Sequence, residues 1–192
     1  MSGSTSRGAA LALGLCLVAC ADADVGPSVP DLDGVLCAPL DVPAGDVHVL
    51  VFTSDECPIA NAYAPTLGAL HETWTATGRV RLFLVHVDPD MTAARAAEHA
   101  AAYALPGRLL LDPAQTLARA CGATITPEAV VRVPGGQVYR GRIDDQWRAL
   151  GSRAPAAAQR DLARAVELAL AGSPVPAPHP PAVGCLFPEP RR

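Results

Sequence analysis

Apolar residues occur in blocks along the first half of the chain, and the blocks have the lengths of strands and helices. Near-continuous apolar runs cover residues 47–52 and 79–87, and runs of this kind predict buried strands. Residues 58–78 and 92–105 carry apolar positions at helical spacing, with a bend predicted at Pro65. Because each strand precedes a helix, the pattern predicts parallel strands joined by helical crossovers.

The second half of the chain contains shorter elements. The pattern predicts a strand, a helix, two further strands and a last helix at residues 108–111, 112–121, 129–133, 137–142 and 156–170. Pro134-Gly135-Gly136 separates the two later strands and predicts an antiparallel hairpin. We therefore expect an α/β fold in which helices flank a mixed central sheet.

The first nineteen residues have the features of an export signal. Arg7 precedes an apolar stretch at residues 9–18 that is too short to span a bilayer. The following Leu17-Val18-Ala19-Cys20 resembles the lipobox of bacterial lipoproteins, in which the cysteine is acylated and becomes the mature N-terminus. The alternative is an ordinary cleavable signal peptide. The resemblance implies a protein anchored in the cell envelope through a lipid on Cys20.

The same resemblance bears on location and on the domain limits. Ala21 follows Cys20, where an Asp would favour the inner membrane, so the expected anchor in a Gram-negative cell is the periplasmic face of the outer membrane. We expect a signal at residues 1–19, a tether at 20–30, one domain at 31–172 and a Pro-rich tail at 173–192. The tail carries Cys185.

Composition argues against one class of partner and excludes one class of chemistry. The formal net charge is -4 and no basic run occurs, which argues against a nucleic-acid partner. The fifteen Lys and Arg residues are all Arg, so Schiff-base chemistry on a lysine is excluded.

Four cysteines remain after removal of the signal and acylation of Cys20: Cys37, Cys57, Cys121 and Cys185. Disulfides persist outside the cytoplasm, and four thiols allow three complete pairings that the sequence does not distinguish. Cys57 stands where the strand at 47–52 should end and a helix should begin at Pro58. Free backbone N–H groups and the helix dipole at that point favour a thiolate.

The order of elements and three motifs resemble the thioredoxin-like superfamily, and within it the redoxin branch of alkyl hydroperoxide reductases and thiol-specific antioxidant proteins. The motifs are residues 55–61 around Cys57, Thr126-Pro127-Glu128, and residues 139–145. Chains of secreted bacterial redoxins also end in a Gly-Cys similar to Gly184-Cys185. The resemblance implies a three-layer thioredoxin-like fold, with Pro127 cis against Cys57 and the Thr126 backbone free to pair with an extended partner.

The resemblance also implies roles for individual residues. The Cys57 thiolate would attack a peroxide or a protein disulfide, and Cys185 would resolve the product. Ser54, Pro58, Thr126 and Pro127 would position the incoming group, without a metal or cofactor. Cys185 could instead form a structural disulfide with Cys37, and Cys121 is expected to be a buried small apolar residue.

Two departures from the family pattern affect the chemistry. Ala60 stands where thioredoxins have their second cysteine, so dithiol exchange within the motif is impossible. Leu50 stands where peroxiredoxins have a proline, so the peroxide-binding loop is only half matched through Ser54. Asp55 and Glu56 oppose a thiolate if they turn inward, and Arg140 or Arg142 could offset them.

A non-catalytic binding module is the alternative from a different class. Such a module would hold a metal, copper by analogy with thioredoxin-fold copper chaperones, or a partner protein in the Cys57 groove. The histidines give no ligand spacing: we expect His48 and His86 on strands, His71 and His99 on helix surfaces, and His179 in the tail. Asp144 and Asp145 are expected to cap or solvate a loop, and Tyr139 and Trp147 to pack against other residues rather than to stack on a substrate.

Overall fold

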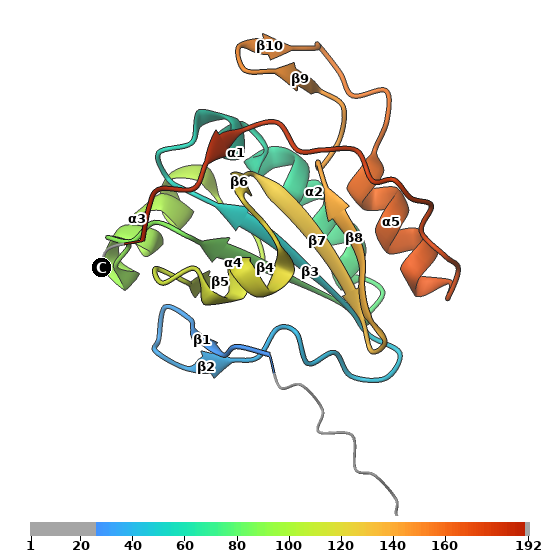
Figure 1. Ribbon diagram of the computed structural model, residues 1–192, viewed down its shortest axis with the longest axis horizontal. Coiled ribbons are helices and arrows are strands. Elements are labelled where there is room, and N and C mark those ends of the chain that lie inside the picture. The colour runs from blue at the N-terminus through green and yellow to red at the C-terminus, as the bar shows by residue number, and fades with distance from the viewer. Residues whose placement is uncertain (1–25, 191–192) are drawn as a thin grey trace, which may run out of the picture.

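The computed structural model describes residues 26–190, and its centre is a five-stranded mixed sheet (Figure 1). The strands lie in the order β5-β4-β3-β7-β8, with bounds Arg108–Leu111, Val80–His86, Val47–Thr53, Glu128–Val133 and Gly136–Gly141. β3, β4 and β5 are parallel, whereas β7 is antiparallel to both β3 and β8. The predicted α/β architecture, with its late hairpin at one side of the sheet, is confirmed.

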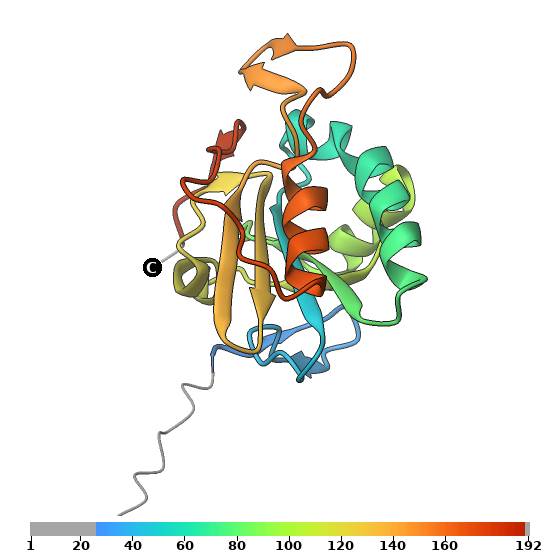
Figure 2. The same cartoon turned by 90° about the vertical axis from the view of Figure 1, so that its right-hand side faces the viewer.

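Within residues 26–190, five helices accompany the sheet: α1 Pro58–Ala62, α2 Ala64–Thr75, α3 Ala93–Tyr103, α4 Thr116–Cys121 and α5 Asp161–Leu170. Strand residues alternate between the faces of a sheet. On one face Val49 and Val51 of β3 pack in a cluster with Leu67 of α2 and Leu162 of α5. The helices α2 and α5 therefore cover this face, as Figure 2 shows from the side.

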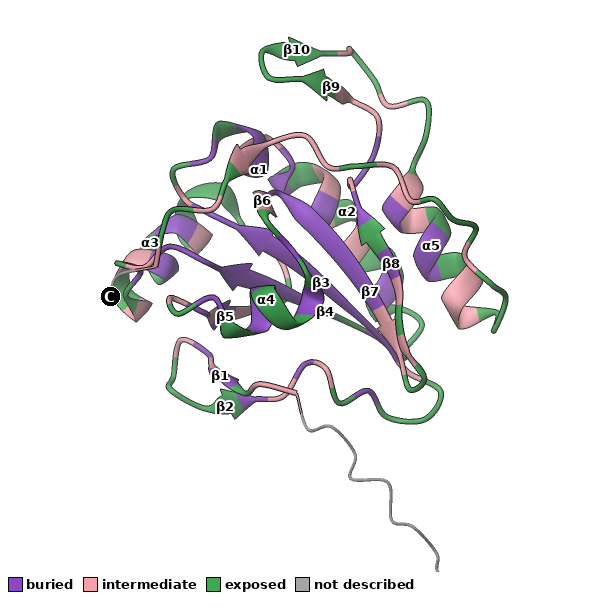
Figure 3. Cartoon of the chain, in the orientation of Figure 1, coloured by how far each residue is buried: buried purple, intermediate pink, exposed green. Residues whose placement is uncertain are grey.

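The other face has its own apolar core. Leu50 and Phe52 of β3 pack there with Leu117 of α4 and with Cys37 of the N-terminal segment. Both faces of β3 are thus covered, and Figure 3 shows the strand buried along its length. Burial on both sides explains why the sequence of β3 is mostly apolar and does not alternate with polar residues.

The predicted helix over residues 58–78 is two helices. Tyr63 ends α1 and precedes α2, and Pro65 lies in the first turn of α2. Pro65 has no N–H and its ring would clash with the carbonyl of Asn61 four residues earlier in a continuous helix. The chain therefore starts a new helix instead of bending one.

The last helix begins five residues later than predicted, at Asp161. The Asp145 carboxylate accepts hydrogen bonds from the N–H groups of Ala158 (2.7 Å) and Gln159 (2.9 Å). These bonds hold the segment before α5 as a loop and confirm a capping role for Asp145.

Short strands that the pattern did not predict complete the structure. β1 (Val29–Pro30) pairs with β2 (Leu36–Cys37), and β9 (Trp147–Ala149) pairs with β10 (Ser152–Arg153) in a hairpin that projects from the body (Figures 1 and 2). Two-residue strands carry no readable period. Val29 is buried, so the end of the predicted tether belongs to the folded domain.

The Pro-rich tail runs back across the molecule. Its β11 (Cys185–Leu186) pairs antiparallel with β6 (Ile125–Thr126), just before β7. Earlier in the tail, the Pro180 carbonyl accepts the N–H of Arg142 beside β8 (3.1 Å). At the opposite side of the sheet, Asp31 forms a bridge with Leu110 of β5. Terminal segments therefore lie against both outer strands.

The predicted signal and Cys20 lie outside the described residues. Within residues 26–190, every helix is too short or too polar to cross a membrane.

Candidate thiol site

Cys57 is the residue that caps the N-terminus of α1. Its backbone is extended (φ -88°, ψ 107°), and its sulfur accepts a hydrogen bond from the N–H of Ala60 (3.5 Å). Pro58 takes the first helical position, where its missing N–H costs nothing. Because α1 has only five residues, the hydrogen bond from Ala60 matters more for the thiolate than a helix dipole does.

The loop before β7 supplies the opposite wall of the site. The Thr126-Pro127 peptide bond is cis, as the resemblance implied. The Cys57 thiol donates a hydrogen bond to the carbonyl oxygen of Thr126 (3.0 Å). Ser54 aside, the residues expected at the site, Cys57, Pro58, Thr126 and Pro127, are therefore brought to one place.

The tail covers this site. Cys185 of β11 is opposite Thr126 in the strand register, and it lies near enough to Cys57 for each thiol to change the pKa of the other. Cys57 is consequently only 1% exposed, whereas reactive cysteines are usually accessible in part. The tail segment contributes to this burial, and the sulfur stays in contact with the Thr126 carbonyl and the Ala60 N–H.

The surroundings of Cys57 favour its ionised form. Burial alone would raise the pKa of the thiol, but the Thr126 side chain, the Ala60 N–H and Cys185 outweigh it and lower the pKa. The carbonyl of Thr126 opposes the change, since it accepts only from the protonated thiol. Donors to the sulfur therefore hold the pKa below the ordinary value.

The pKa values of Cys185 and Cys121 are raised, in contrast to that of Cys57. Burial and the neighbouring Cys57 raise the pKa of Cys185 to about 11, and burial raises the pKa of Cys121 to about 11. Cys121 is 3% exposed within an apolar cluster, which confirms its expected packing role. At neutral pH the site therefore holds one activated sulfur beside one protonated thiol.

No family model matches this chain, and no curated protein matches it. Solved structures do. An uncharacterised conserved protein from Geobacillus kaustophilus matches with a TM-score of 0.72 and 23% identity, over 87% of this chain and 92% of that one. A hypothetical protein from Sinorhizobium meliloti matches with a TM-score of 0.65 and 25% identity, over 83% and 88%.

Two further solved structures match with lower TM-scores. DsbF from Mycobacterium tuberculosis has a TM-score of 0.57 and 22% identity, over 76% of this chain and 96% of that one. A secreted M. tuberculosis disulfide oxidoreductase homologous to E. coli DsbE has a TM-score of 0.56 and 19% identity, over 77% and 100%. The fold is thioredoxin-like. At these identities the likeness concerns the fold, and the activity has to be argued from the thiol site itself.

In this thioredoxin-like domain the acidic residues beside Cys57 have a different cation from the one expected. Arg95 of α3 binds the Asp55 carboxylate at 2.6 Å and Glu56 at 3.0 Å. Arg140 and Arg142, the expected partners, instead pair with Glu128 and with Asp161. The correction follows from the fold, because α3 lies beside the loop of residues 54–57 and β8 does not.

Ser54 is not among the groups that the structure places at the sulfur. Its hydroxyl donates to Asp88 (2.6 Å) and accepts the N–H of Glu56 (3.2 Å). Burial alone would raise the pKa of Asp88, but His86, 4.0 Å away, and the Ser54 hydroxyl lower it. Ser54 thus shapes the loop before Cys57 and directs its proton away from the thiol.

The expectation for His99 is wrong. His99 is 6% exposed, accepts or donates a hydrogen bond at Asn61 (2.8 Å), and lies edge-on to the buried His86 at 5.2 Å between ring centroids. The spacing in α3 placed it on the surface, but the side of the helix next to β4 and α1 is the buried one. Over residues 26–190, no group of three His, Cys, Asp or Glu side chains is arranged to hold a metal ion.

The structure does not bring Cys37 to Cys185. Cys37 lies in β2, where its thiol donates to the Val35 carbonyl (3.4 Å), and it packs on the face covered by α4. Cys185 packs on the cluster that contains Cys57. All four cysteines in the described part of the chain are unpaired, and Cys185 is the one placed beside Cys57.

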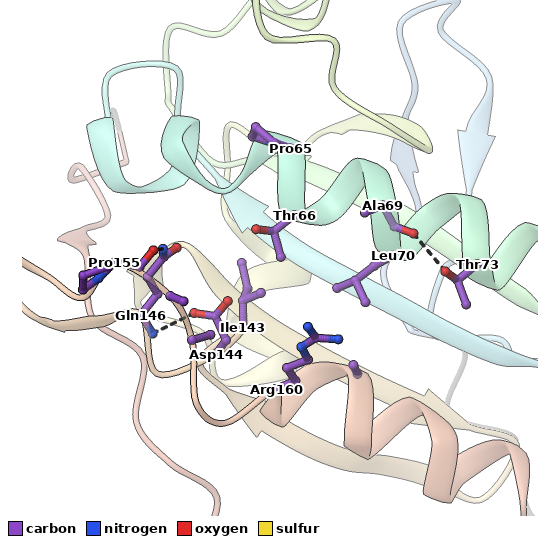
Figure 4. Close-up of a pocket in the computed structure, with 13 residues that line it drawn as sticks. Pro65, Thr66, Ala69, Leu70, Thr73, Ile143, Asp144, Gln146, Pro155 and Arg160 are labelled. Atoms are coloured by element: carbon purple, nitrogen blue, oxygen red, sulfur yellow. Dashed lines mark hydrogen bonds between the residues drawn. The ribbon is translucent and has the colours of Figure 1, made fainter.

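A separate cavity of about 560 Å³ opens between α2 and the segment leading into α5 (Figure 4). The buried Asp144 lines it and accepts hydrogen bonds from the Tyr63 hydroxyl (2.6 Å) and the Gln146 N–H (2.9 Å). Neither Cys57 nor Cys185 lines this cavity. It therefore lies outside the thiol site.

The alkylation rate of Cys57 should follow its lowered pKa. A thiol reacts as its thiolate, so the rate with iodoacetamide, resolved by peptide mapping, should rise with pH and reach half its plateau below the ordinary value of about 8.5. Cys185 should reach half its plateau near pH 11. A midpoint for Cys57 at or above that of Cys185 would contradict the assignment.

The same shift has a consequence for stability. Because the folded pKa of Cys57 lies below the unfolded one, the thiolate stabilises the fold above the unfolded pKa. This contribution is lost as the pH falls through the folded pKa.

Proposed function

We propose that the protein is an exported thiol-disulfide oxidoreductase in which Cys57 is the nucleophile and Cys185 the resolving thiol. One observation carries the proposal: strand pairing with Thr126 places Cys185 beside Cys57 at the start of α1, and the pKa values of the two thiols are moved in opposite directions. A low-pKa thiolate beside a protonated thiol is the arrangement that disulfide exchange requires.

The reaction proceeds through two exchanges. The Cys57 thiolate attacks one sulfur of a substrate disulfide, which forms a mixed disulfide and releases the other substrate sulfur as a thiolate. Cys185 then loses its proton to that thiolate and attacks the Cys57 sulfur, which forms the Cys57–Cys185 disulfide and releases the second substrate thiolate. The substrate gains two electrons and the protein loses two, and an external dithiol returns the protein to its reduced form.

The contacts of Ser54 favour a disulfide over a peroxide as the substrate. A peroxide needs donors that stabilise the departing oxygen, yet the Ser54 hydroxyl is directed to Asp88 and Arg95 is occupied by Asp55 and Glu56. The leaving group of a protein disulfide is a thiolate, which needs less stabilisation than the oxygen of a peroxide. The backbone of the Thr126 loop is sufficient to align such a substrate with Cys57.

Trapping experiments test the proposal. Wild-type protein incubated with oxidised glutathione should form an internal Cys57–Cys185 disulfide, seen in a non-reducing peptide map. Cys185→Ser should stop at a glutathione adduct on Cys57, because the resolving sulfur is missing. Cys37→Ser is the matched control and should behave as wild type. A Cys37–Cys185 cross-link in the wild type, or no adduct in Cys185→Ser, would contradict the proposal and favour a binding module without turnover.

We also propose export and anchoring through a lipid on Cys20. The Leu17–Cys20 motif supports the lipid, and the disulfide chemistry suits an oxidising compartment. The periplasmic face of the outer membrane remains the proposed location in a Gram-negative cell.

A further inference from the structure

The tail occupies the thiol site as an extended strand. Cys185 and Leu186 pair with Thr126 and Ile125, and the N–H of Phe187 donates to the Thr124 carbonyl (3.1 Å). Beyond this, the side chain of Gln115 donates to the Pro188 carbonyl (2.7 Å). A segment docked mainly through its backbone shows how another polypeptide could bind in its place.

The residue before the tail cysteine has to be glycine. A Cβ atom built on Gly184 would overlap the carbonyl oxygen of Thr126. That carbonyl also accepts from Cys57, so it cannot move aside without disturbing the nucleophile. Close approach of the two backbones at this point therefore selects against any side chain.

The two residues after the cysteine differ from each other. Leu186 is 78% exposed, so the site does not restrict the side chain at this position. Phe187 packs against the cluster around β3, with its ring centroid 6.2 Å from that of the fully buried Phe52. The site therefore has a seat for an aromatic ring two residues beyond the cysteine.

We propose that the tail is an internal copy of the substrate, and that the site selects extended polypeptide segments with the pattern Gly-Cys-x-aromatic. This inference rests on the proposed function, because it assumes that Cys57 attacks the cysteine sulfur placed where Cys185 lies. The substrate class is thus an unfolded or loop segment of a protein that carries an oxidised cysteine, and the docked tail competes with it.

Peptides test the selection directly. The probe is a hexapeptide with the sequence of residues 183–188 whose cysteine is joined as a disulfide to 5-thio-2-nitrobenzoate. The Cys57 thiolate attacks the peptide sulfur and releases the coloured thiolate, which gives the rate. The protein is full-length Gly184→Ala, in which the added methyl group displaces the tail and leaves the site open.

The expected rates differ between peptides. Alanine in place of the peptide glycine should slow the reaction at least tenfold, and alanine in place of the aromatic residue should slow it severalfold. Alanine in place of the leucine is the matched control and should change the rate less than twofold. Wild-type protein should react with the parent peptide at least tenfold more slowly than Gly184→Ala does, and Phe187→Ala provides a second variant with a loosened tail.

The outcomes separate the inference from the function. Equal rates for the parent and the alanine-for-glycine peptide would overturn the selection, as would a parent peptide that fails while 5,5′-dithiobis(2-nitrobenzoate) reacts at Cys57. Equal rates in wild type and both loosened variants would overturn the competition by the tail. If the small disulfide also fails to react at Cys57, the proposed function fails.

Discussion

Replacement of Cys57 by serine should abolish disulfide exchange. The hydroxyl of Cys57→Ser cannot form a disulfide, so reduction of oxidised glutathione by the protein with an external dithiol should fall to the rate in buffer. The loss should be on the order of a thousandfold or more. The measurement is the initial rate at pH 7, with the fold checked by circular dichroism.

Two matched variants define the specificity of this effect. Cys37→Ser and Cys121→Ala each remove a thiol remote from the site, and both should retain the wild-type rate once folded. Activity that survives in Cys57→Ser, or that is lost equally in Cys37→Ser, would show that Cys57 is not the nucleophile.

The largest expected loss of stability follows from Phe52→Ala. Phe52 lies in the central strand β3 and is fully buried. Truncation of such a ring costs about 3–5 kcal/mol through lost burial and the cavity left behind. The free energy of unfolding of a domain of this size is about 5–15 kcal/mol. The urea midpoint should therefore fall by a large fraction. The loss also removes the partner of Phe187, and alkylation of Cys57 should become faster.

Leu36→Ala is the control for this prediction. Leu36 is 69% exposed, and substitutions at such positions usually change the free energy of unfolding by less than about 0.5 kcal/mol. A midpoint shift in Phe52→Ala no larger than that in Leu36→Ala would contradict the assigned core.

The long elements of the fold follow from the sequence because their patterns are strong. The runs at residues 47–52 and 79–87 are mostly apolar, since both faces of β3 and β4 pack in apolar clusters. The glycines after Pro134 mark the hairpin. Other element boundaries depend on single tertiary contacts. Asp145 holds residues 158 and 159 outside α5, and no local sequence pattern predicts such a hydrogen bond.

The thiol site was predictable only in part. A cysteine between a strand and a helix, and Thr126 before Pro127, were readable as motifs. The seat of the tail was not, because β6 and β11 have two residues each and lie about sixty positions apart. Gly184 was the available signal, since a glycine before a cysteine suggests close backbone contact. Arg95 gave no signal, because its pairing with Asp55 depends on how α3 is placed.

The contacts of the terminal segments with the outer strands have a consequence for solubility. An uncovered outer strand recruits strands of other molecules and leads to aggregation. Pro180 blocks the N–H of Arg142 beside β8, and Asp31 blocks β5 at Leu110. Truncation after Gly172 would therefore remove both Cys185 and the tail segment that covers the edge beside β8, and we expect the truncated protein to self-associate. Any stretch of tail that a substrate displaces must stop short of Pro180 if the protein is to stay monodisperse during its cycle.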